Sequence, residues 1–425
     1  MTTIRSRGNG GRPTPLRNKH NPHAHGNEQP PKEYGVTLQA DDVVIVDALR
    51  TPFGKRNGML SGWHPVTLAA NLVARLLERA GVGPQMVDQV ILGCVSQFGE
   101  QSLNIARNVL LTAGMPETVP GTTVDFQCGS SQQAAHLAVN AIRSGASHIV
   151  LAGGVESMSR VPLGSTFSSE RSPNPPELLS RFPIPHQGIS AQLVADKYGV
   201  SRQEMDAFAV SSHEHAASAT ARGDLAVEIM PVGSGNDAGS EEISRDEGIR
   251  ENASLEAVAA LQPAFNPDHA ITAGNASQIS DGASAILMMS AAKAEELGLK
   301  PRAKITAQLV VGCDPVTMLE GPIPATEAML DKTGMSIDDI DLFEVNEAFA
   351  SIPLAWLKAT GAPRDRLNVN GGAIALGHPV GASGARLITT IMGELERREG
   401  RYGLVTMCCG GGLGTATLVE RVVEA

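Results

Sequence analysis

From residue 42 onward, short runs of β-branched and apolar residues alternate with longer segments whose apolar positions recur at helical spacing. The first run, 43–46, has no polar residue and predicts a buried strand. The segment 66–80 has a helical pattern that ends at Gly81. Strands that alternate with amphipathic helices indicate an α/β protein whose helices pack on sheets. The other predicted elements are strands at 87–93, 122–126, 148–154, 283–290 and 404–407, and helices at 102–111 and 130–143.

A less regular stretch, about residues 159 to 270, interrupts this alternation. It contains the Pro-rich segment 172–176 and the polar run 233–248. A helical pattern over 189–221 lies between these two breaks. The stretch therefore predicts an insertion with a fold of its own.

Two segments far apart in the chain resemble each other. Cys128 opens a Gly/Ser turn, which a helix and then a strand ending at 153–154 follow. His378 opens a similar turn and helix, and the strand 404–407 then leads into the glycines 410–412. One unit used twice predicts two similar α/β halves, each with a special residue at a strand-to-helix junction on a shared crevice.

The length and charge of the chain restrict its class. The 425 residues, 42% hydrophobic and 19% charged, suit two or three soluble globular domains. The net charge of −11 provides no overall attraction for nucleic acid or an anionic membrane, so an anionic ligand needs local contacts. Residues 1–40 carry +4, are rich in Gly, Pro, Asn and His, and predict a disordered tail, with a transit peptide as the weaker alternative. No apolar run is long enough for a membrane span.

The cysteines are odd in number and widely spaced, and they form no C-x-x-C pattern. We therefore expect neither disulfides nor a metal site, and we expect a reducing, cytoplasmic environment. Each cysteine is either a small buried residue or a reactive thiol. They are Cys94, Cys128, Cys313, Cys408 and Cys409.

Five residues are candidates for chemistry. Cys128 precedes a predicted helix, whose N-terminus favours a thiolate, although a core cysteine is the alternative. Cys408 ends a strand, and the glycines after it offer N–H groups for an oxyanion hole; Cys409 should point the other way and pack. His378 lies among glycines in 370–379, where either a functional or a structural histidine fits. Of the polar pair Asn346 and Glu347, one should face a site or cap a helix.

Together these segments resemble the thiolase family, and the resemblance covers about residues 41–424. It implies a layered α-β-α-β-α fold made of two duplicated halves with an inserted loop domain that binds coenzyme A. The expected division is a tail at 1–40, a first half at 41–158 completed by about 275–292, a loop domain at 159–274 and a second half at 293–425. The motifs are QCGSS at 127–131, NEAFA at 346–350, GGAIALGHPVGASGAR at 371–386 and CCGGGLG at 408–414, with weaker matches at 50–54, 153–158 and 274–277.

The resemblance implies an acyltransferase that cleaves 3-ketoacyl-CoA with CoA, or runs the reverse Claisen condensation. Cys128 is then the nucleophile that carries an acyl thioester, and His378 is the general base and an oxyanion donor. Cys408 is the second acid/base. Asn346 holds a water that binds the enolate oxygen, and the N–H of Gly410 belongs to the acyl oxyanion hole.

The resemblance also implies the contacts with CoA, which is a co-substrate here and not a tightly bound cofactor. Arg250 in this acidic chain can hold a phosphate locally. Ala257 departs from a number of relatives that have a CoA-bonding Ser there, and Ser131 and Gln187 stand where synthetic relatives often have Gly and Met. The implied CoA contacts are His186, Arg250, Ala273 and Ser277.

The motif at 127–134 is more similar to bacterial degradative thiolases, including those that act on bulky or steroid side chains, and a homodimer or homotetramer is expected by the same analogy. An acetyl-CoA acetyltransferase working in the condensation direction is the alternative. A ketoacyl-carrier-protein synthase is disfavoured because the second partner is Cys408 rather than a histidine. A non-catalytic CoA-binding protein is disfavoured because Cys128, His378 and Cys408 are all present.

Overall fold

The computed structural model describes residues 37–167, 172–234 and 241–423. The tail predicted for 1–40 therefore lies outside the described residues except for its last four. One mixed sheet runs through the molecule in the order β10-β11-β12-β9-β1-β8-β5-β3-β4, and β2 (Gly54–Lys55) pairs with β8. The α/β class expected from the sequence is confirmed.

The first half of the chain forms the strand order β4-β3-β5-β8-β1. β3 is parallel to both β4 and β5, whereas β8 is antiparallel to β5 and β1. Because β8 follows the insertion in sequence, the inserted stretch interrupts this half before its last strand. The bounds are β1 (Val43–Arg50), β3 (Gln89–Gly93), β4 (Gly121–Val124), β5 (Ile149–Ser157) and β8 (Ser280–Ser290).

The second half repeats this arrangement in the order β10-β11-β12-β9. β10 is parallel to β11, and β12 is antiparallel to β11 and β9, as in the first half. An isolated parallel bridge between Phe343 and Leu367 occupies the place that β4 has in the first half. The predicted duplication is therefore present in the strand order and directions. The bounds are β9 (Ala303–Gly312), β10 (Leu342–Val345), β11 (Tyr402–Cys409) and β12 (Leu413–Arg421).

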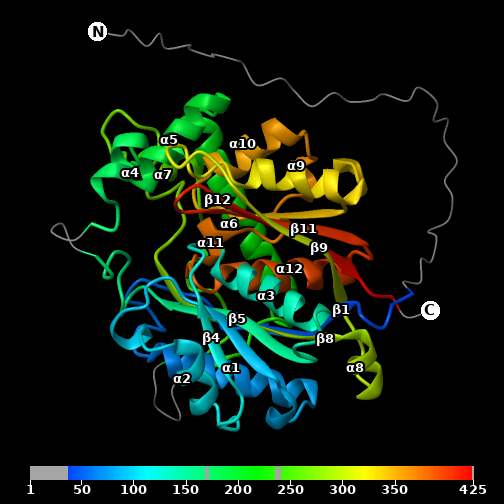
Figure 1. The fold of residues 1–425 in the computed structure, drawn as a ribbon. Coiled ribbons are helices and arrows are strands. Elements are labelled where there is room, and N and C mark those ends of the chain that lie inside the picture. The colour runs from blue at the N-terminus through cyan, green and yellow to red at the C-terminus, as the bar shows by residue number, and fades with distance from the viewer. Residues whose placement is uncertain (1–36, 168–171, 235–240, 424–425) are drawn as a thin grey trace, which may run out of the picture.

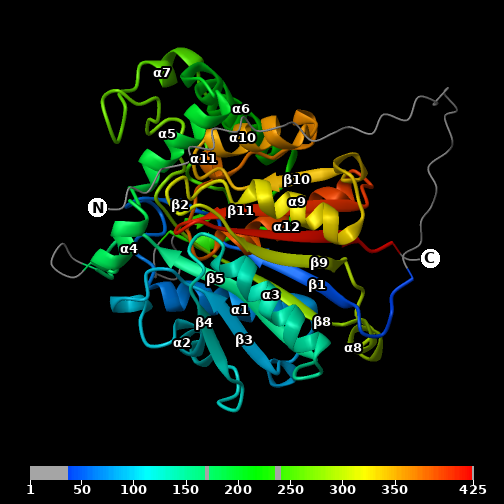
Figure 2. The same ribbon diagram turned by 45° about the horizontal axis from the view of Figure 1, so that its top comes forward.

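Helices α3 (Ser130–Arg143) and α12 (Ser383–Arg397) lie between the strands of the two halves and touch each other (Figure 1). Because α12 is covered on both sides, it is buried from Ser383 to Leu395. Outer helices complete the layers on either side (Figure 2), so the α-β-α-β-α fold is confirmed. They are α1 (Pro65–Ala80) and α2 (Ile105–Thr112) on the first half, and α9 (Pro322–Thr333) and α10 (Ser351–Thr360) on the second.

Helices are the main regular elements of the insertion, and its helical pattern over 189–221 forms two helices. Gly199 ends the first in a left-handed conformation, and Ser201 begins the second with a capping box to Glu204. None of the described helices combines the length and apolar character needed to cross a bilayer. The inserted elements are α4 (Pro176–Arg181), α5 (Gln187–Tyr198), α6 (Arg202–Arg222), α7 (Leu255–Ala259), β6 (Val232–Gly233) and β7 (Glu242–Ile243); α8 (Ala291–Glu296) and α11 (Ala373–Leu376) lie outside it.

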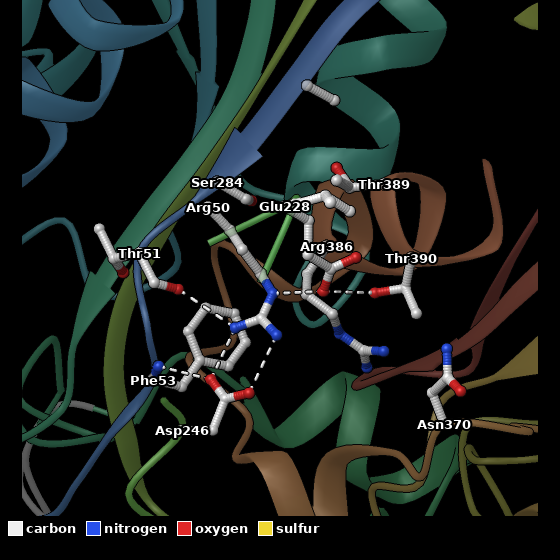
Figure 3. Close-up of polar contacts among 12 residues, drawn as sticks. Arg50, Thr51, Phe53, Glu228, Asp246, Ser284, Asn370, Arg386, Thr389 and Thr390 are labelled. Atoms are coloured by element: carbon white, nitrogen blue, oxygen red, sulfur yellow. Dashed lines mark hydrogen bonds and ion pairs between the residues drawn. The ribbon is translucent and has the colours of Figure 1, made fainter. Parts of the chain in front are cut away.

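The insertion is joined to both halves by a buried ion cluster around Arg50, at the end of β1 (Figure 3). The Arg50 Nε donates to Glu228 at 2.7 Å, and its two terminal nitrogens donate to Asp246 at 2.6 and 2.9 Å. Glu228 also accepts from Thr390 of α12 at 3.1 Å. The backbone N–H of Phe53 donates to Asp246. The motif at 50–54 thus has a structural role, because both carboxylates belong to the insertion.

A second junction brings the backbones of the two halves into contact beside His378. A β-carbon on Gly154 would lie 2.0 Å from the carbonyl oxygen of Gly381, so only glycine fits there. The buried Glu156 of β5 accepts the N–H of Gly381 at 3.1 Å. Ser131, at the start of α3, accepts the N–H of Ala385 at 2.9 Å. These contacts explain the motif at 153–158 and fix the loop that carries His378.

Candidate active site

Cys128 lies between β4 and α3, and its environment keeps the thiol protonated. Burial raises the pKa of Cys128 to about 11, although the N–H groups of Gly410 and of Cys128 itself hydrogen-bond the sulfur and lower it. The expected thiolate at the helix N-terminus is therefore not the resting state, because desolvation outweighs the N–H groups. The same N–H groups are placed to bind an oxyanion on a carbonyl attached to Cys128.

His378 is buried, and its hydrogen bonds assign its tautomer. The Ser383 hydroxyl donates to the carbonyl of Pro379 at 3.0 Å and lies 2.6 Å from Nδ1, so it accepts a proton held on Nδ1. Nε2 then carries the lone pair and can act as a base. Burial, together with the nearby Arg386, lowers the pKa of His378 to about 3. A neutral imidazole with a lone pair on Nε2 is what a general base requires. Ser383 was not identified from the sequence.

Asn346 connects His378 to Cys408. Its Nδ2 lies 3.4 Å from His378 Nε2, and its side chain also hydrogen-bonds the thiol of Cys408. Its Oδ1 is buried without a partner among the described residues, so it can accept a further hydrogen bond. Burial and the neighbouring Cys128 raise the pKa of Cys408 far above its usual value. Cys409 packs on the opposite face, against the core around α3 and α12, as predicted.

The two polar residues of the NEAFA motif have separate roles. Asn346 faces His378, whereas Glu347 accepts from Ser212 at 2.7 Å and from the N–H of Ile374 at 3.1 Å. Glu347 therefore fastens α6 and α11 beside the site. The helix-cap alternative is wrong, because α10 begins at Ser351 and neither residue caps it.

An aromatic wall that sequence reasoning missed lies beside the predicted CoA contacts. The ring of His186, the N-cap of α5, lies 5.0 Å from that of Phe265, which in turn lies 6.0 Å from Phe349. Ser277 donates its backbone N–H to the carbonyl of Ala348 at 2.9 Å. Phe349 follows directly in the NEAFA motif and could have been found there, whereas nothing in the sequence marks Phe265.

The other two predicted CoA contacts, Arg250 and Ala273, are also at the surface. The backbone N–H of Arg250 donates to His213 Nδ1 at 3.2 Å, and its side chain extends into solvent without an ion pair to any described residue. Ala273 is exposed at the end of the insertion. An unpaired guanidinium remains available for a phosphate. No cluster of three or more potential metal ligands occurs within 37–167, 172–234 and 241–423.

Comparisons with known proteins agree with this geometry. A model described as "Thiolase, N-terminal domain" matches residues 43–292, and one described as "Thiolase, C-terminal domain" matches residues 299–421. The chain belongs to the thiolase family. It is therefore an acyltransferase that acts on acyl-CoA and CoA.

The relatives of this thiolase cover nearly its whole described length. A steroid 3-ketoacyl-CoA thiolase from Mycobacterium tuberculosis is 48% identical over 90% of this chain and 94% of its own. A 3-ketoacyl-CoA thiolase from Aliivibrio fischeri is 44% identical over 89% of this chain and 99% of its own. The crystal structure of a Bacillus anthracis acetyl-CoA acetyltransferase has a TM-score of 0.83 at 39% identity, covering 89% of this chain and 98% of that one.

In this thiolase a continuous series of contacts joins the residues singled out from the motifs. Gly410 contacts Cys128, Cys128 lies near Cys408, and Asn346 bridges Cys408 to His378. The predicted CoA contacts lie apart from this series, on the insertion and its junction with the second half. The site thus has a buried reacting centre and a more exposed approach.

Proposed function

We propose that this thiolase cleaves 3-ketoacyl-CoA with free CoA, giving acetyl-CoA and an acyl-CoA two carbons shorter. The observation that carries the proposal is the pair of buried, protonated thiols, Cys128 and Cys408, with Asn346 joining the second to a neutral His378. Two thiols, a base and N–H donors are the groups that cleavage of a carbon–carbon bond next to a carbonyl requires.

In the first half-reaction, His378 Nε2 takes the proton of Cys128, and the sulfur attacks the keto carbonyl. The resulting oxyanion binds the N–H groups of Cys128 and Gly410. The bond between C2 and C3 then breaks, and its electron pair becomes the enolate of acetyl-CoA. Cys408 gives its proton to C2 of this enolate, whose oxygen is bound by His378 and by a water on Asn346. Acetyl-CoA leaves, and Cys128 holds the acyl group.

In the second half-reaction the acyl group passes to CoA. The proton on His378 first returns to the Cys408 thiolate, which leaves the imidazole neutral. His378 then takes the proton of the incoming CoA thiol, whose sulfur attacks the thioester of Cys128. The tetrahedral oxyanion again uses the N–H groups of Cys128 and Gly410, and the expelled Cys128 thiolate recovers the proton from His378.

We place the CoA moiety at His186, Arg250, Ala273 and Ser277, with no tightly bound cofactor. The unpaired guanidinium of Arg250 supports a phosphate contact, and the aromatic wall beside His186 supports a path for the pantetheine arm. These residues also support the division in which 159–274 forms a CoA-binding loop domain between a first half at 41–158 with 275–292 and a second half at 293–425.

We assign a degradative role, with bulky acyl groups among the substrates. The names of the similar 3-ketoacyl-CoA thiolases support a degradative role. The similar steroid 3-ketoacyl-CoA thiolase supports a bulky acyl group in the substrate. Exposed apolar side chains in the insertion, at Leu163, Phe167 and Leu179, support an apolar acyl substituent. The acetyl-CoA acetyltransferase with the same fold supports the alternative, an acetoacetyl-CoA thiolase.

CoA-dependent thiolysis across 3-ketoacyl-CoAs, from acetoacetyl upward and including one bulky branched substrate, tests this proposal. A preference for long or bulky chains is expected. A preference for acetoacetyl-CoA would establish the acetyltransferase alternative, and no thiolysis of any substrate would contradict the proposal.

We further propose a homodimer or homotetramer in the cytoplasm. β4 is a terminal strand of the sheet, and the segment before α2, which packs on β4, exposes Phe98 at 55% and Leu103 at 87%. The free thiols of Cys128 and Cys408 suit a reducing compartment. Light scattering on the purified protein tests the assembly, and a monomer would contradict it.

A further inference from the structure

Gly410, two residues after Cys408, lies between two side-chain amides. A β-carbon on Gly410 would lie 2.8 Å from Gln187 Nε2 and 3.0 Å from Gln127 Oε1. Both amides are therefore packed against the residue whose N–H points at the Cys128 sulfur. Any larger residue in place of Gly410 would displace them.

Neither amide is satisfied within the described part of the chain. Gln127 uses its backbone N–H in a bond to Asp125 at 2.8 Å, but its side chain makes no hydrogen bond there, and neither does that of Gln187. Both side chains are half-buried. Unpaired amides at a partly desolvated surface favour a ligand that can hydrogen-bond to them.

Both residues are held in place by the backbone. Gln187 is the first residue of α5, directly after the His186 N-cap, whose Nδ1 accepts from Gly188 at 3.1 Å. Gln127 precedes Cys128 and has a φ of 51°, in the left-handed region that residues with side chains rarely adopt. The backbones that carry the two amides are thus fixed relative to the reacting thiol.

We infer that Gln187, assisted by Gln127, selects acyl groups that carry a hydrogen-bonding oxygen a few carbons from the reacting carbonyl. This inference rests on the proposed function. When the carbonyl on Cys128 points its oxygen at the N–H of Gly410, the acyl substituent on the same carbon begins beside Gly410, where the two amides lie. A hydroxyl or keto oxygen there binds them, whereas a plain alkyl group covers them without replacing their bonds to water.

A matched pair of substrates tests the inference: 3-oxohexanoyl-CoA and 5-hydroxy-3-oxohexanoyl-CoA, which differ by one hydroxyl. The wild type should show about tenfold higher kcat/KM for the hydroxylated substrate, the amount expected from one net hydrogen bond. Gln187→Leu should remove this preference, and Gln187→Asn should restore part of it. Gln85→Leu, an exposed glutamine in a distant turn, is the matched control and should keep the preference.

Two outcomes would overturn the inference while the proposed function stands: no preference in the wild type, or an unchanged preference in Gln187→Leu. If both rates of Gln187→Leu fall equally, a raised KM for CoA would assign Gln187 to CoA, and an unchanged KM would show a merely structural role. Absence of thiolysis of either substrate by the wild type would instead refute the proposed function and the inference with it.

Discussion

Two buried polar clusters lie where the parts of this thiolase meet, and they differ in how completely their groups are paired. In the cluster around Arg50, the guanidinium bonds two carboxylates, and each carboxylate has a further donor, Phe53 or Thr390. In the active site the groups are neutral because both thiols are protonated, and Asn346 Oδ1 has no partner among the described residues.

The fully paired cluster contributes stability, whereas the incompletely paired cluster contributes chemistry. A buried ion pair with all its hydrogen bonds in place holds segments together, and breaking it leaves an uncompensated charge. A buried group with a free lone pair or proton can instead react with a substrate, and its perturbed pKa reflects that environment. We therefore expect changes in the two clusters to have opposite consequences for folding and turnover.

The largest effect on turnover is expected from Cys128→Ala. Loss of the nucleophile should lower thiolysis by about 10⁴-fold or more, because no other group can carry the acyl chain. Stability and CoA binding should remain close to wild type, since Cys128 makes no ion pair. Thiolysis rates and calorimetric CoA titration measure both quantities, and an active variant would remove Cys128 as the nucleophile.

A smaller but selective effect is expected from Cys408→Ala. The variant should still accept an acyl group on Cys128 from acyl-CoA, but thiolysis should fall by about 10²–10⁴-fold, the usual contribution of a general acid. Mass spectrometry of the acylated protein, beside a thiolysis assay, tests this expectation. Normal thiolysis would exclude Cys408 from the mechanism.

Arg50→Met should have the opposite effect, a loss of stability without a loss of turnover. Leaving Glu228 and Asp246 buried without their cation should lower the free energy of unfolding by about 3–5 kcal/mol, while the folded fraction keeps its kcat. Urea unfolding followed by circular dichroism measures the loss. Arg75→Met, which breaks an exposed pair with Glu78, is the control and should change stability little. Equal stabilities of the two variants would contradict the structural role of the Arg50 cluster.

The smallest effect concerns pH and a histidine outside both clusters. Burial lowers the pKa of His136 to about 3, so the folded protein keeps it neutral while the unfolded chain protonates it near pH 6.5. Its contribution to stability is therefore complete above about pH 6.5 and is lost as the pH falls toward 3. When the pH falls from 7 to 5, the free energy of unfolding of the wild type should fall by about 1–2 kcal/mol more than that of His136→Gln. Parallel unfolding curves at the two pH values would refute this.

Much of the fold could be predicted from the sequence, because local patterns determine it. The helix at 130–143 and the duplicated unit followed from periodicity and glycine turns, and the structure has both. The motifs also led to Cys128, His378 and Cys408 without any knowledge of their contacts.

What the sequence did not reveal depends on packing between distant segments. The protonated state of Cys128 follows from burial, which a helix N-terminus alone does not predict. Ser383 and Phe265 contact His378 and His186 only in the folded chain. Glu156 accepts N–H groups from Val95 and Ser96 of its own half, but its bond from Gly381 of the other half also depends on the fold. Such contacts become visible only when the chain is folded.

The most direct test of the account is a single turnover without free CoA. Wild-type enzyme mixed with a 3-ketoacyl-CoA should release one equivalent of acetyl-CoA per site and retain the shortened acyl group. Peptide mapping by mass spectrometry should find that group on Cys128. Acetyl-CoA release with the acyl group on Cys408, or with no acyl group on the protein, would contradict the central role of Cys128.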